Sequence, residues 1–357
     1  MQKSIGYKEI FETIRRDILT GKYADEGTLP SEIALARRFK VCRPTVSHAM
    51  QELTMSGLVV RRKGAPTTLT RFAQNASGHI GLVIQGRWTE DDLYPRISRR
   101  LSDLAERSGW KMVRCEIVAT SKRGRLLEIK RIVDRLTAEH VTGVYFQPVE
   151  CISKSDTINK DIVVRFRKAG IHVVLLDYDI VGLPGHSSCD LVGVDNFAAG
   201  YELGCHLVGR GFRRVAFLKL PFAAPSVEDR MRGVACAMLE RTGRWDPSQS
   251  VVVCDPTDVV SLRRKLMGRS PQAIVAYNDR AAVQLLESLR SIKRLRNALV
   301  VGFDDIPVSE TNDPPITTMR QDVARLAELA FHALVTRIRN PKLPPRKILL
   351  PCKLVVR

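Results

Sequence analysis

The sequence lacks any apolar run of about 18 residues, the length that a membrane-spanning helix needs. Its first 20 residues carry charges every few positions, unlike the apolar core of a secretory signal. The eight cysteines lie far apart and form no CxxC pair, so neither a zinc knuckle nor a dense disulfide framework is expected. These absences predict a cytoplasmic protein with reduced thiols and no membrane partner.

Signatures of catalysis are missing too. No Gly-x-Gly-x-x-Gly follows the first strand expected after residue 79, and neither a P-loop lysine motif nor a Gly-x-Ser-x-Gly turn occurs. The seven histidines show no spacing typical of metal ligands. We therefore expect no catalytic residues, no cofactor and no metal.

Acidic residues are scarce relative to basic ones. The 357 residues include 57 Lys and Arg against 38 Asp and Glu, a formal net charge of +19. Such an excess favours a polyanionic partner, and its sign alone leaves nucleic acid and an anionic membrane open. The length suggests two or three domains, and the 44% hydrophobic content is that of an ordinary globular protein.

Residues 1–71 have the pattern of a small helical domain. Apolar residues recur at helical spacing in three stretches, and a glycine turn between two β-branched runs over residues 58–70 predicts a basic hairpin. Residues 72–78 are small and mostly polar, which predicts a linker. The apolar positions are Tyr7, Ile10, Ile14 and Ile18, then Ile33, Ala36 and Phe39, then Val46, Met50 and Leu53.

Residues 79–357 alternate between apolar runs and amphipathic stretches of helical length. This order predicts an α/β fold with parallel sheets covered on both faces, and the length favours two lobes over one. The runs are residues 80–84, 112–118, 141–146, 171–176, 191–194, 214–218, 251–253, 273–277 and 298–303.

Residues 30–57 offer what a helix needs to enter the major groove of DNA. Ser31 is a candidate N-cap of a first helix, and a second helix should begin near Arg43. Its exposed side would carry Arg43, Thr45, Ser47 and His48, although His48 fits a surface position without base contact equally well. The run Arg61, Arg62 and Lys63 would be a solvated face on composition alone, but a hairpin beside a recognition helix favours phosphate contact.

Several fixed spacings in this region resemble the winged helix-turn-helix of the GntR family. They are Leu29-Pro30-Ser31-Glu32, Val41-x-Arg43-x-Thr45-Val46 and Leu53-x-x-x-Gly57-Leu58-Val59. The resemblance implies that Arg43, Thr45 and Ser47 meet DNA and that the loop around Gly64 is the wing. Cys42, Ser47 and the segment 64–67 depart from the usual family residues, which leaves the operator sequence and wing contacts open.

Polar residues follow five of the expected strands, where open α/β sheets bind ligands. Any one of them alone would more often be a turn or helix cap, but their recurrence favours a binding crevice. They are Gln147, Asp177, Asp195, Asn278 and Asp304.

The segments 191–200, 273–279, 300–305 and 315–321 resemble the effector domain of the LacI/GalR family, which is similar in fold to periplasmic sugar-binding proteins. The resemblance implies a small-molecule effector in the cleft, for which a sugar is the preferred class. Trp88 and Tyr94 would stack on an apolar sugar face or pack between the lobes, with equal weight. The effector residues implied are Gln85, Gln147, Asp177, Asp195, Arg230, Asn278 and Asp304.

We predict a sequence-specific DNA-binding transcription regulator, expected to be a repressor, in which a winged helix-turn-helix over residues 1–71 is fused to an effector domain over residues 79–357. This arrangement is similar to arabinose-repressor-type regulators. The expected partners are double-stranded operator DNA, a small metabolite and a second copy of the chain. The alternatives are a small-molecule binding or transport protein, an enzyme fused to a DNA reader, and a regulator with a vestigial pocket.

Overall fold

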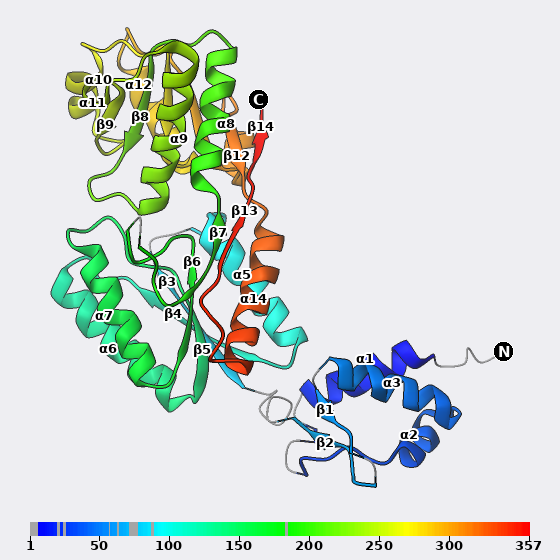
Figure 1. Ribbon diagram of the computed structural model, residues 1–357. Coiled ribbons are helices and arrows are strands. Elements are labelled where there is room, and N and C mark those ends of the chain that lie inside the picture. Colours follow the sequence, from blue (N-terminus) through cyan, green and yellow to red (C-terminus); the bar gives the residue numbers. More distant parts are fainter. Residues whose placement is uncertain are drawn as a thin grey trace.

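The computed structural model describes residues 6–19, 22–23, 26–56, 58–62, 64–70, 78–86, 89–182 and 185–357. A small helical part at the N-terminus precedes two stacked α/β lobes (Figure 1). We call the lobe nearer the N-terminal part the N-lobe and the other the C-lobe. All but one of the residues predicted to form a linker lie outside the described residues, so the boundary at 72–78 stays a prediction.

The N-terminal part packs three helices against a short hairpin. Its helices bury one face each: Ile10, Ile14 and Ile18 of the first are fully buried. The prediction for the second helix was wrong in one detail, because Ile33 is 53% exposed and Leu35 is buried instead. The elements are α1 (Tyr7–Leu19), α2 (Glu32–Phe39), α3 (Arg43–Met55) and the antiparallel strands β1 (Val59–Val60) and β2 (Thr68–Leu69).

The N-lobe is a six-stranded parallel sheet with strand order β13-β7-β6-β5-β3-β4. Helices α5 and α14 cover one face and α6 and α7 the other, so both faces are buried. The elements are β3 (His79–Gln85), α5 (Leu93–Arg107), β4 (Lys111–Ile117), α6 (Lys122–Ala138), β5 (Val141–Phe146), α7 (Ser155–Lys168), β6 (His172–Leu176), β7 (Asp190–Val194), α14 (Val323–Arg339) and β13 (Lys347–Leu350).

The C-lobe has a second six-stranded sheet, in the order β14-β12-β11-β10-β8-β9, in which β14 alone runs antiparallel to its neighbour. The predicted two-lobed α/β fold with parallel sheets is therefore confirmed. The elements are α8 (Asn196–Gly209), β8 (Val215–Lys219), α9 (Pro225–Thr242), α10 (Pro247–Ser250), β9 (Val251–Val253), α11 (Val259–Leu266), β10 (Ala273–Ala276), α12 (Asp279–Arg290), β11 (Leu299–Asp304), α13 (Pro307–Thr311), β12 (Thr317–Arg320) and β14 (Lys353–Val355).

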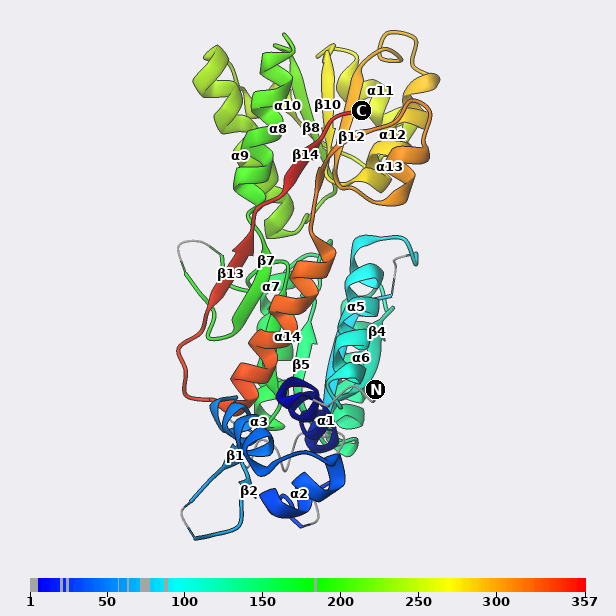
Figure 2. The same cartoon turned by 90° about the vertical axis from the view of Figure 1, so that its right-hand side faces the viewer.

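The chain passes between the lobes three times. It crosses from β7 to α8, returns from β12 to α14, and crosses again from β13 to β14 (Figure 2). The three crossings lie beside one another, which is the arrangement of a hinge between two bodies.

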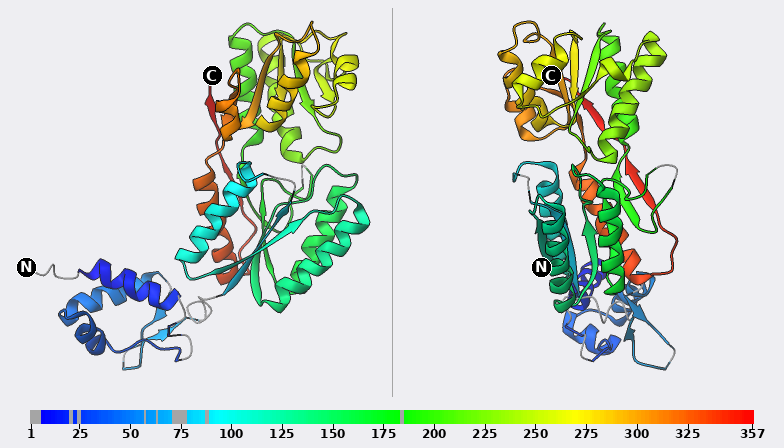
Figure 3. Two further views of the ribbon diagram at one scale, coloured as in Figure 1. Left: turned by 180° about the vertical axis from the view of Figure 1, so that it is seen from behind. Right: turned by 90° about the vertical axis from the view of Figure 1, so that its left-hand side faces the viewer.

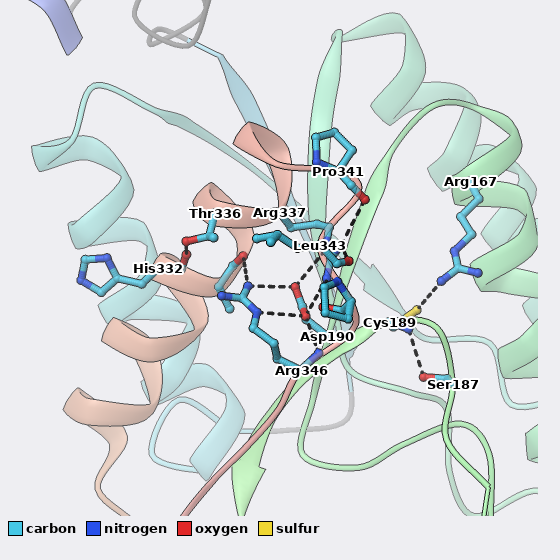
Figure 4. A network of polar contacts seen from close by, with 12 residues as sticks. Arg167, Ser187, Cys189, Asp190, His332, Thr336, Arg337, Pro341, Leu343 and Arg346 are labelled. Atoms are coloured by element: carbon cyan, nitrogen blue, oxygen red, sulfur yellow. Dashed lines mark hydrogen bonds and ion pairs between the residues drawn. The ribbon is translucent and has the colours of Figure 1, made fainter. Parts of the chain in front are cut away.

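A buried ion network anchors the third crossing strand to the N-lobe (Figure 4). Asp190, which is fully buried at the start of β7, accepts hydrogen bonds from Arg337 Nε at 3.0 Å and Arg337 Nη2 at 2.9 Å. Arg346 adds bonds from its backbone N at 2.8 Å and its Nη2 at 3.0 Å. Burial opposes ionisation of Asp190, but the two arginines outweigh it and lower the pKa of its carboxyl. Helix α14 and the segment before β13 are thereby tied to β7.

Glycines allow α8 and α9 of the C-lobe to pack backbone to backbone. A Cβ at Gly200 would lie 2.0 Å from the carbonyl oxygen of Arg230, and one at Gly233 would lie 2.1 Å from a carbonyl oxygen of α8. No side chain larger than hydrogen fits such contacts. This close approach fixes α9, the helix that carries Arg230.

The N-terminal part lies at the end of the N-lobe that is remote from the C-lobe (Figure 3). Burial and the positive charge of Arg15 in α1 lower the pKa of Arg339 at the end of α14, which places α1 near that helix end. No helix within the described ranges is both long and apolar enough to span a bilayer.

Candidate functional site

The start of α3 and the end of β1 form one basic surface on the N-terminal part. Arg43 is exposed in the first turn of α3, and Arg61 and Arg62 are exposed just after β1. Thr45 and Ser47 are partly buried on α3. Cations flanking a helix N-terminus suit the phosphates and base edges of DNA.

Glu32 joins the helix and the hairpin. Its carboxylate accepts a hydrogen bond from Arg43 Nε at 3.2 Å through one oxygen and pairs with Arg61 Nη2 through the other. The side chain of Glu32 is 14% exposed, so the pair of arginines is held by a largely buried acceptor. The link of Glu32 to Arg61, 29 positions away, has no local signal in the sequence.

Other residues predicted to meet DNA have structural partners. Ser31 Oγ accepts a hydrogen bond from the backbone N of Ala34 at 3.2 Å, so its hydroxyl caps α2 as expected. The ring of His48 stacks on that of Tyr7, with centroids 3.9 Å apart and an interplanar angle of 18°. Gly64 has φ of +78°, which a tight turn requires. Lys63 lies outside the described residues.

A small cavity of about 50 Å³, partly open to solvent, lies between the two lobes at the ends of their strands. Polar and charged side chains of both lobes face it, together with aromatic and aliphatic groups. The residues that line it are Asp92, Leu93, Tyr94, Glu150, Cys151, Asp177, Leu220, Ala223, Ala224, Ser226, Val227, Arg230, Tyr277, Asn278 and Asp304.

Arg230 is the central cation of the cavity and is 5% exposed. Its Nε donates to Asn196 Oδ1 at 2.8 Å, and its Nη1 donates to the carbonyl of Tyr277 at 2.7 Å. Its Nη2 pairs with Asp304 Oδ1 at 3.4 Å, and the guanidinium carbon lies 4.7 Å from the ring centroid of Phe303. All three guanidinium nitrogens of Arg230 thus have hydrogen-bond or ion-pair partners, which fixes the orientation of the group.

Asp304 is 7% exposed and also accepts from Gln321 Nε2 at 2.8 Å. Burial raises the pKa of Asp304 to about 6, against the opposing effects of Arg230 and Gln321. Its φ of +107° is unusual for a residue with a side chain, and strain of this kind gathers at ligand sites. At neutral pH the carboxyl of Asp304 is mostly ionised and accepts hydrogen bonds, and a fall in pH through about 6 would protonate it.

Asp177 links the lobes inside the cavity. Its Oδ2 accepts from Tyr94 Oη at 2.8 Å within the N-lobe and from Ser226 Oγ at 2.9 Å across the cleft. Further contacts cross between the lobes. The backbone N of Cys151 donates to the carbonyl of Phe222 at 3.0 Å, Arg280 pairs with Asp92 at 2.8 Å, and Arg96 Nη1 donates to the carbonyl of Asp305 at 3.3 Å. Small polar contacts of this kind can break and re-form as the lobes move.

The structure therefore brings together Asp177, Arg230, Asn278 and Asp304. Asn278 also caps α12. Three other predicted effector residues do not line this cavity: Asp195 caps α8 by accepting from Ala198 N at 2.9 Å, and the buried Gln147 accepts from the backbone N of Gln85 at 3.0 Å. Trp88 lies outside the described residues.

Sequence reasoning missed Asp92, Glu150, Ser226 and Tyr277 in the cavity wall. Glu150 comes four residues after the end of β5, so the rule that polar residues after strands line the cavity could have identified it. Asp92 precedes α5 and Ser226 lies in the first turn of α9, so their presence depends on how loops and lobes pack. The described residues hold no group of three His, Cys, Asp or Glu side chains placed to bind a metal ion.

Comparison with known proteins agrees with this geometry. Residues 6–69 match the family model described as bacterial regulatory proteins, gntR family, and residues 205–357 match the model of a periplasmic binding protein-like domain. The chain joins a GntR-type domain to a periplasmic binding protein-like domain. The GntR-type domain includes the basic surface, and the second match covers most of the C-lobe.

Relatives extend over nearly the whole of this two-part chain. An arabinose metabolism transcriptional repressor of Geobacillus stearothermophilus is 23% identical over 348 residues, which is 94% of this chain and 91% of the relative. A ribose operon repressor of Escherichia coli (strain K12) is 25% identical over 333 residues, covering 88% and 95% of the two chains. These relatives confirm the predicted resemblance to arabinose repressors and LacI-type regulators.

Solved structures share the fold. A transcriptional regulator CelR–cellobiose complex aligns with a TM-score of 0.65 and 21% identity, covering 92% of this chain and 99% of that one. A periplasmic binding protein/LacI transcriptional regulator of Alkaliphilus metalliredigens, complexed with D-xylulofuranose, aligns with a TM-score of 0.63 and 18% identity, covering 79% and 98%. Both likenesses are to the fold, and the first extends beyond the share of the chain that the two lobes occupy.

Proposed function

We propose that the protein is a sequence-specific DNA-binding transcription regulator, acting as a repressor, whose operator affinity is set by a small metabolite held between the lobes. The observation that carries this proposal is the pairing of Arg230 and Asp304 in a polar cavity between two hinged lobes, on a chain with a GntR-type domain. The arabinose and ribose repressors among its relatives favour repression and a sugar. The proposed role involves no catalytic step.

DNA recognition falls to the basic surface of the N-terminal part. Arg43, Thr45 and Ser47 at the start of α3 would reach base edges, and Arg61 and Arg62 beside the turn at Gly64 would contact phosphates. Glu32 holds Arg43 and Arg61 in place before DNA arrives, which reduces the entropy lost on binding. Ser31 and His48 would act through helix capping and stacking, and Lys63 would add to the positive charge of the wing.

Effector recognition falls to the cavity. Asp177 and Asp304 would accept hydrogen bonds from hydroxyl groups, and Asn278 can donate or accept. Every matched group matters, because a buried polar group without a partner costs about 1–3 kcal/mol. Three residues would support the site indirectly, by fixing the backbone at the strand ends: Gln85, Gln147 and Asp195. Trp88 is a candidate for stacking on a sugar.

Coupling between the two sites would run through lobe closure. Ligand contacts from both lobes favour a closed hinge, and the N-terminal part sits on the far end of the N-lobe. In a cytoplasmic homodimer, which two-fold operators favour, a change in hinge angle would alter the separation of the two recognition helices. Coupling of this kind amounts to about fivefold to 150-fold in affinity.

The decisive experiment measures operator affinity with and without candidate sugars. DNA fragments selected by binding to the parent protein supply the operator, and fluorescence anisotropy gives its dissociation constant. A sugar that binds by calorimetry should change that constant at least about fivefold. Arg230→Ala should keep DNA binding and lose the sugar response, whereas Arg264→Ala on the exposed face of α11 should behave like the parent. A bound sugar that leaves DNA affinity unchanged contradicts the proposal.

A further inference from the structure

The cavity between the lobes is too small to enclose a whole sugar ring. Its volume of about 50 Å³ is room for about three to five water molecules, since one buried water needs at least about 10–15 Å³. Pockets that bind small molecules usually measure about 300–1,000 Å³. With the lobes in this arrangement, a ligand that reaches Arg230 and Asp304 therefore places most of its atoms elsewhere in the cleft.

A second hollow adjoins the cavity and offers this room. We call it the outer hollow; it measures about 890 Å³ and lies between the loop after β6, the loop between β8 and α9, and strand β13. Asp177, Ala223 and Ser226 line both spaces. The hydrogen bond from Ser226 Oγ to Asp177 Oδ2, at 2.9 Å, therefore lies where the two spaces meet. A ligand hydroxyl that replaced Ser226 on Asp177 would join them.

Apolar side chains of both lobes are exposed in the outer hollow. Phe222, between β8 and α9, is 60% exposed, and Phe197, in the first turn of α8, is 44% exposed. Leu349 of β13 lines the same hollow from the N-lobe and is 37% exposed. Exposed apolar side chains gathered on one concave surface are typical of ligand-binding grooves. Aromatic rings in such a place can stack on the apolar face of a sugar or on another aromatic ring.

The backbone at Phe222 fixes the position of its ring. Its φ is +54°, a conformation that residues with a side chain seldom adopt and that is frequent at ligand sites. Its carbonyl oxygen accepts a hydrogen bond from the backbone N of Cys151 at 3.0 Å, which joins this loop to the N-lobe. The chain then enters α9, the helix of Ser226 and Arg230. A ring bound against Phe222 would therefore contact the segment that leads into the polar wall of the cavity.

Three carboxylates of the outer hollow already have partners within the protein. Asp195 accepts from the first turn of α8 at 2.9 Å, Asp179 accepts from backbone N atoms of its own loop at 3.1 Å, and Asp229 pairs with Arg232 at 2.8 Å. Exchanging such bonds for bonds to a ligand hydroxyl gains little. The outer hollow therefore offers a ligand mainly apolar contact, whereas the cavity offers hydrogen bonds.

We propose that the effector is a glycoside with two rings. Hydroxyl groups of its first ring would reach Asp177 and Asp304 in the cavity, and its second ring, a sugar or an aromatic group, would lie against Phe222 and Phe197 in the outer hollow. This inference rests on the proposed function of the cavity as the effector site. Because Leu349 faces the second ring from the other lobe, that ring would also favour the closed form of the hinge.

The test uses the full chain and matched sets of ligands at pH 7. Each set holds a monosaccharide, its methyl glycosides, its phenyl glycosides and disaccharides in which it is the non-reducing unit, in the gluco, galacto, xylo and arabino configurations. Calorimetry should find a two-ring member that binds at least about tenfold more tightly than the monosaccharide and methyl glycosides of its set, a difference of about 1.4 kcal/mol. A phenyl glycoside or a disaccharide in first place tells whether the second ring is aromatic or a sugar.

Two results overturn the inference. One is a monosaccharide or methyl glycoside that binds as tightly as the two-ring members of its set, which would mean that the cavity itself widens around a single ring. The other is the absence of binding by every two-ring member.

Two variants examine the source of the preference. Phe222→Ala and Phe197→Ala each remove one exposed ring, so each should lower the preference for the two-ring ligand over the methyl glycoside at least about threefold. A general loss of stability would weaken both ligands and leave this ratio unchanged. Val260→Ala, at a 79% exposed position of α11, should keep the preference of the parent. An unchanged ratio in both phenylalanine variants also counts against the inference.

The outcomes separate this inference from the proposed function. A monosaccharide that binds best and shifts operator affinity leaves the regulator intact and removes the second ring. A two-ring glycoside that binds without shifting operator affinity supports the ligand class and removes the switch.

Discussion

Replacing Asp190 by asparagine tests whether the buried ion network holds the hinge segment in place. Asp190 is fully buried and accepts from two arginines, of which Arg337 is 8% exposed. The asparagine keeps one acceptor oxygen but turns an amide NH₂ toward the guanidinium groups and leaves their charge uncompensated. Breaking a buried pair in this way costs about 3–5 kcal/mol of unfolding free energy.

The same carboxyl predicts a pH dependence of stability. Its pKa in the folded protein is lowered by Arg337 and Arg346 in spite of burial, so the folded state holds this proton less tightly than the unfolded chain. The contribution of Asp190 to stability is therefore complete above the ordinary pKa of an aspartate and is lost as the pH falls through the lowered value. Asp190→Asn should flatten the acid limb of the stability curve.

Urea unfolding is followed by the fluorescence of Trp110. This residue is 4% exposed in the core of the N-lobe, the lobe that contains Asp190, so its fluorescence reports on the unfolding of that lobe. The other two tryptophans are replaced by phenylalanine in both parent and variant. Asp161→Asn is the matched control: Asp161 pairs with Arg165 on the surface, both side chains are 42% exposed, and its loss should cost about 0–0.5 kcal/mol. A cost for Asp190→Asn below about 1 kcal/mol, or one equal to the control, would refute the reasoning.

Three further outcomes are expected. Because burial raises the pKa of Asp304 to about 6, ligand affinity measured by calorimetry should fall as the pH drops from 7 through 6, and Asp304→Asn should bind weakly with a flatter profile. Arg43→Ala should cost about 1–3 kcal/mol in operator binding free energy and relax the preference for the operator sequence. Arg62→Ala should lower the slope of log binding constant against log salt concentration by about 0.9 in magnitude on every DNA sequence. Equal effects of the two variants would contradict the roles of Arg43 at base edges and Arg62 at phosphates. Gly233→Ala places a Cβ 2.1 Å from a carbonyl of α8 and should lower the melting temperature by several degrees, while Gly209→Ala, with nothing within 4 Å, should not.

The central strands were predictable because parallel strands buried on both faces read as unbroken apolar runs. All nine predicted runs coincide with β3 to β11. Strands β12, β13 and β14 were not predicted by this rule. The apolar runs of β13 and β14 are only three and two residues long, too short to stand out from the surrounding sequence.

Helix α2 shows a limit of periodicity in short segments. The spacing of Ile33, Ala36 and Phe39 located two residues that pack against the core, Ala36 and Phe39, but it included the exposed Ile33 and left out the buried Leu35. The packing of Leu35 against α1 and α3 decides the orientation, and that is a tertiary effect.

The strand-end rule located part of the cavity. Asp177, Asn278 and Asp304 line it because carboxyl ends of parallel strands meet at one edge of each sheet. Asp195 caps α8 and lines a neighbouring hollow between the lobes, since β7 leads directly into a crossing between them. The partners that complete the wall, such as Ser226, come from the other lobe, and no local pattern encodes the approach of two lobes.

The three crossings between the lobes bear on how the protein is made. Strand β13, which completes the N-lobe sheet, begins only at Lys347, and the arginines that neutralise Asp190 are Arg337 and Arg346. During synthesis the lobe translated first therefore stays unfinished until β13 has been translated, after the whole of the C-lobe up to β12. Truncation near the carboxyl terminus should harm both lobes at once, and neither lobe corresponds to a contiguous stretch that could be expressed by itself.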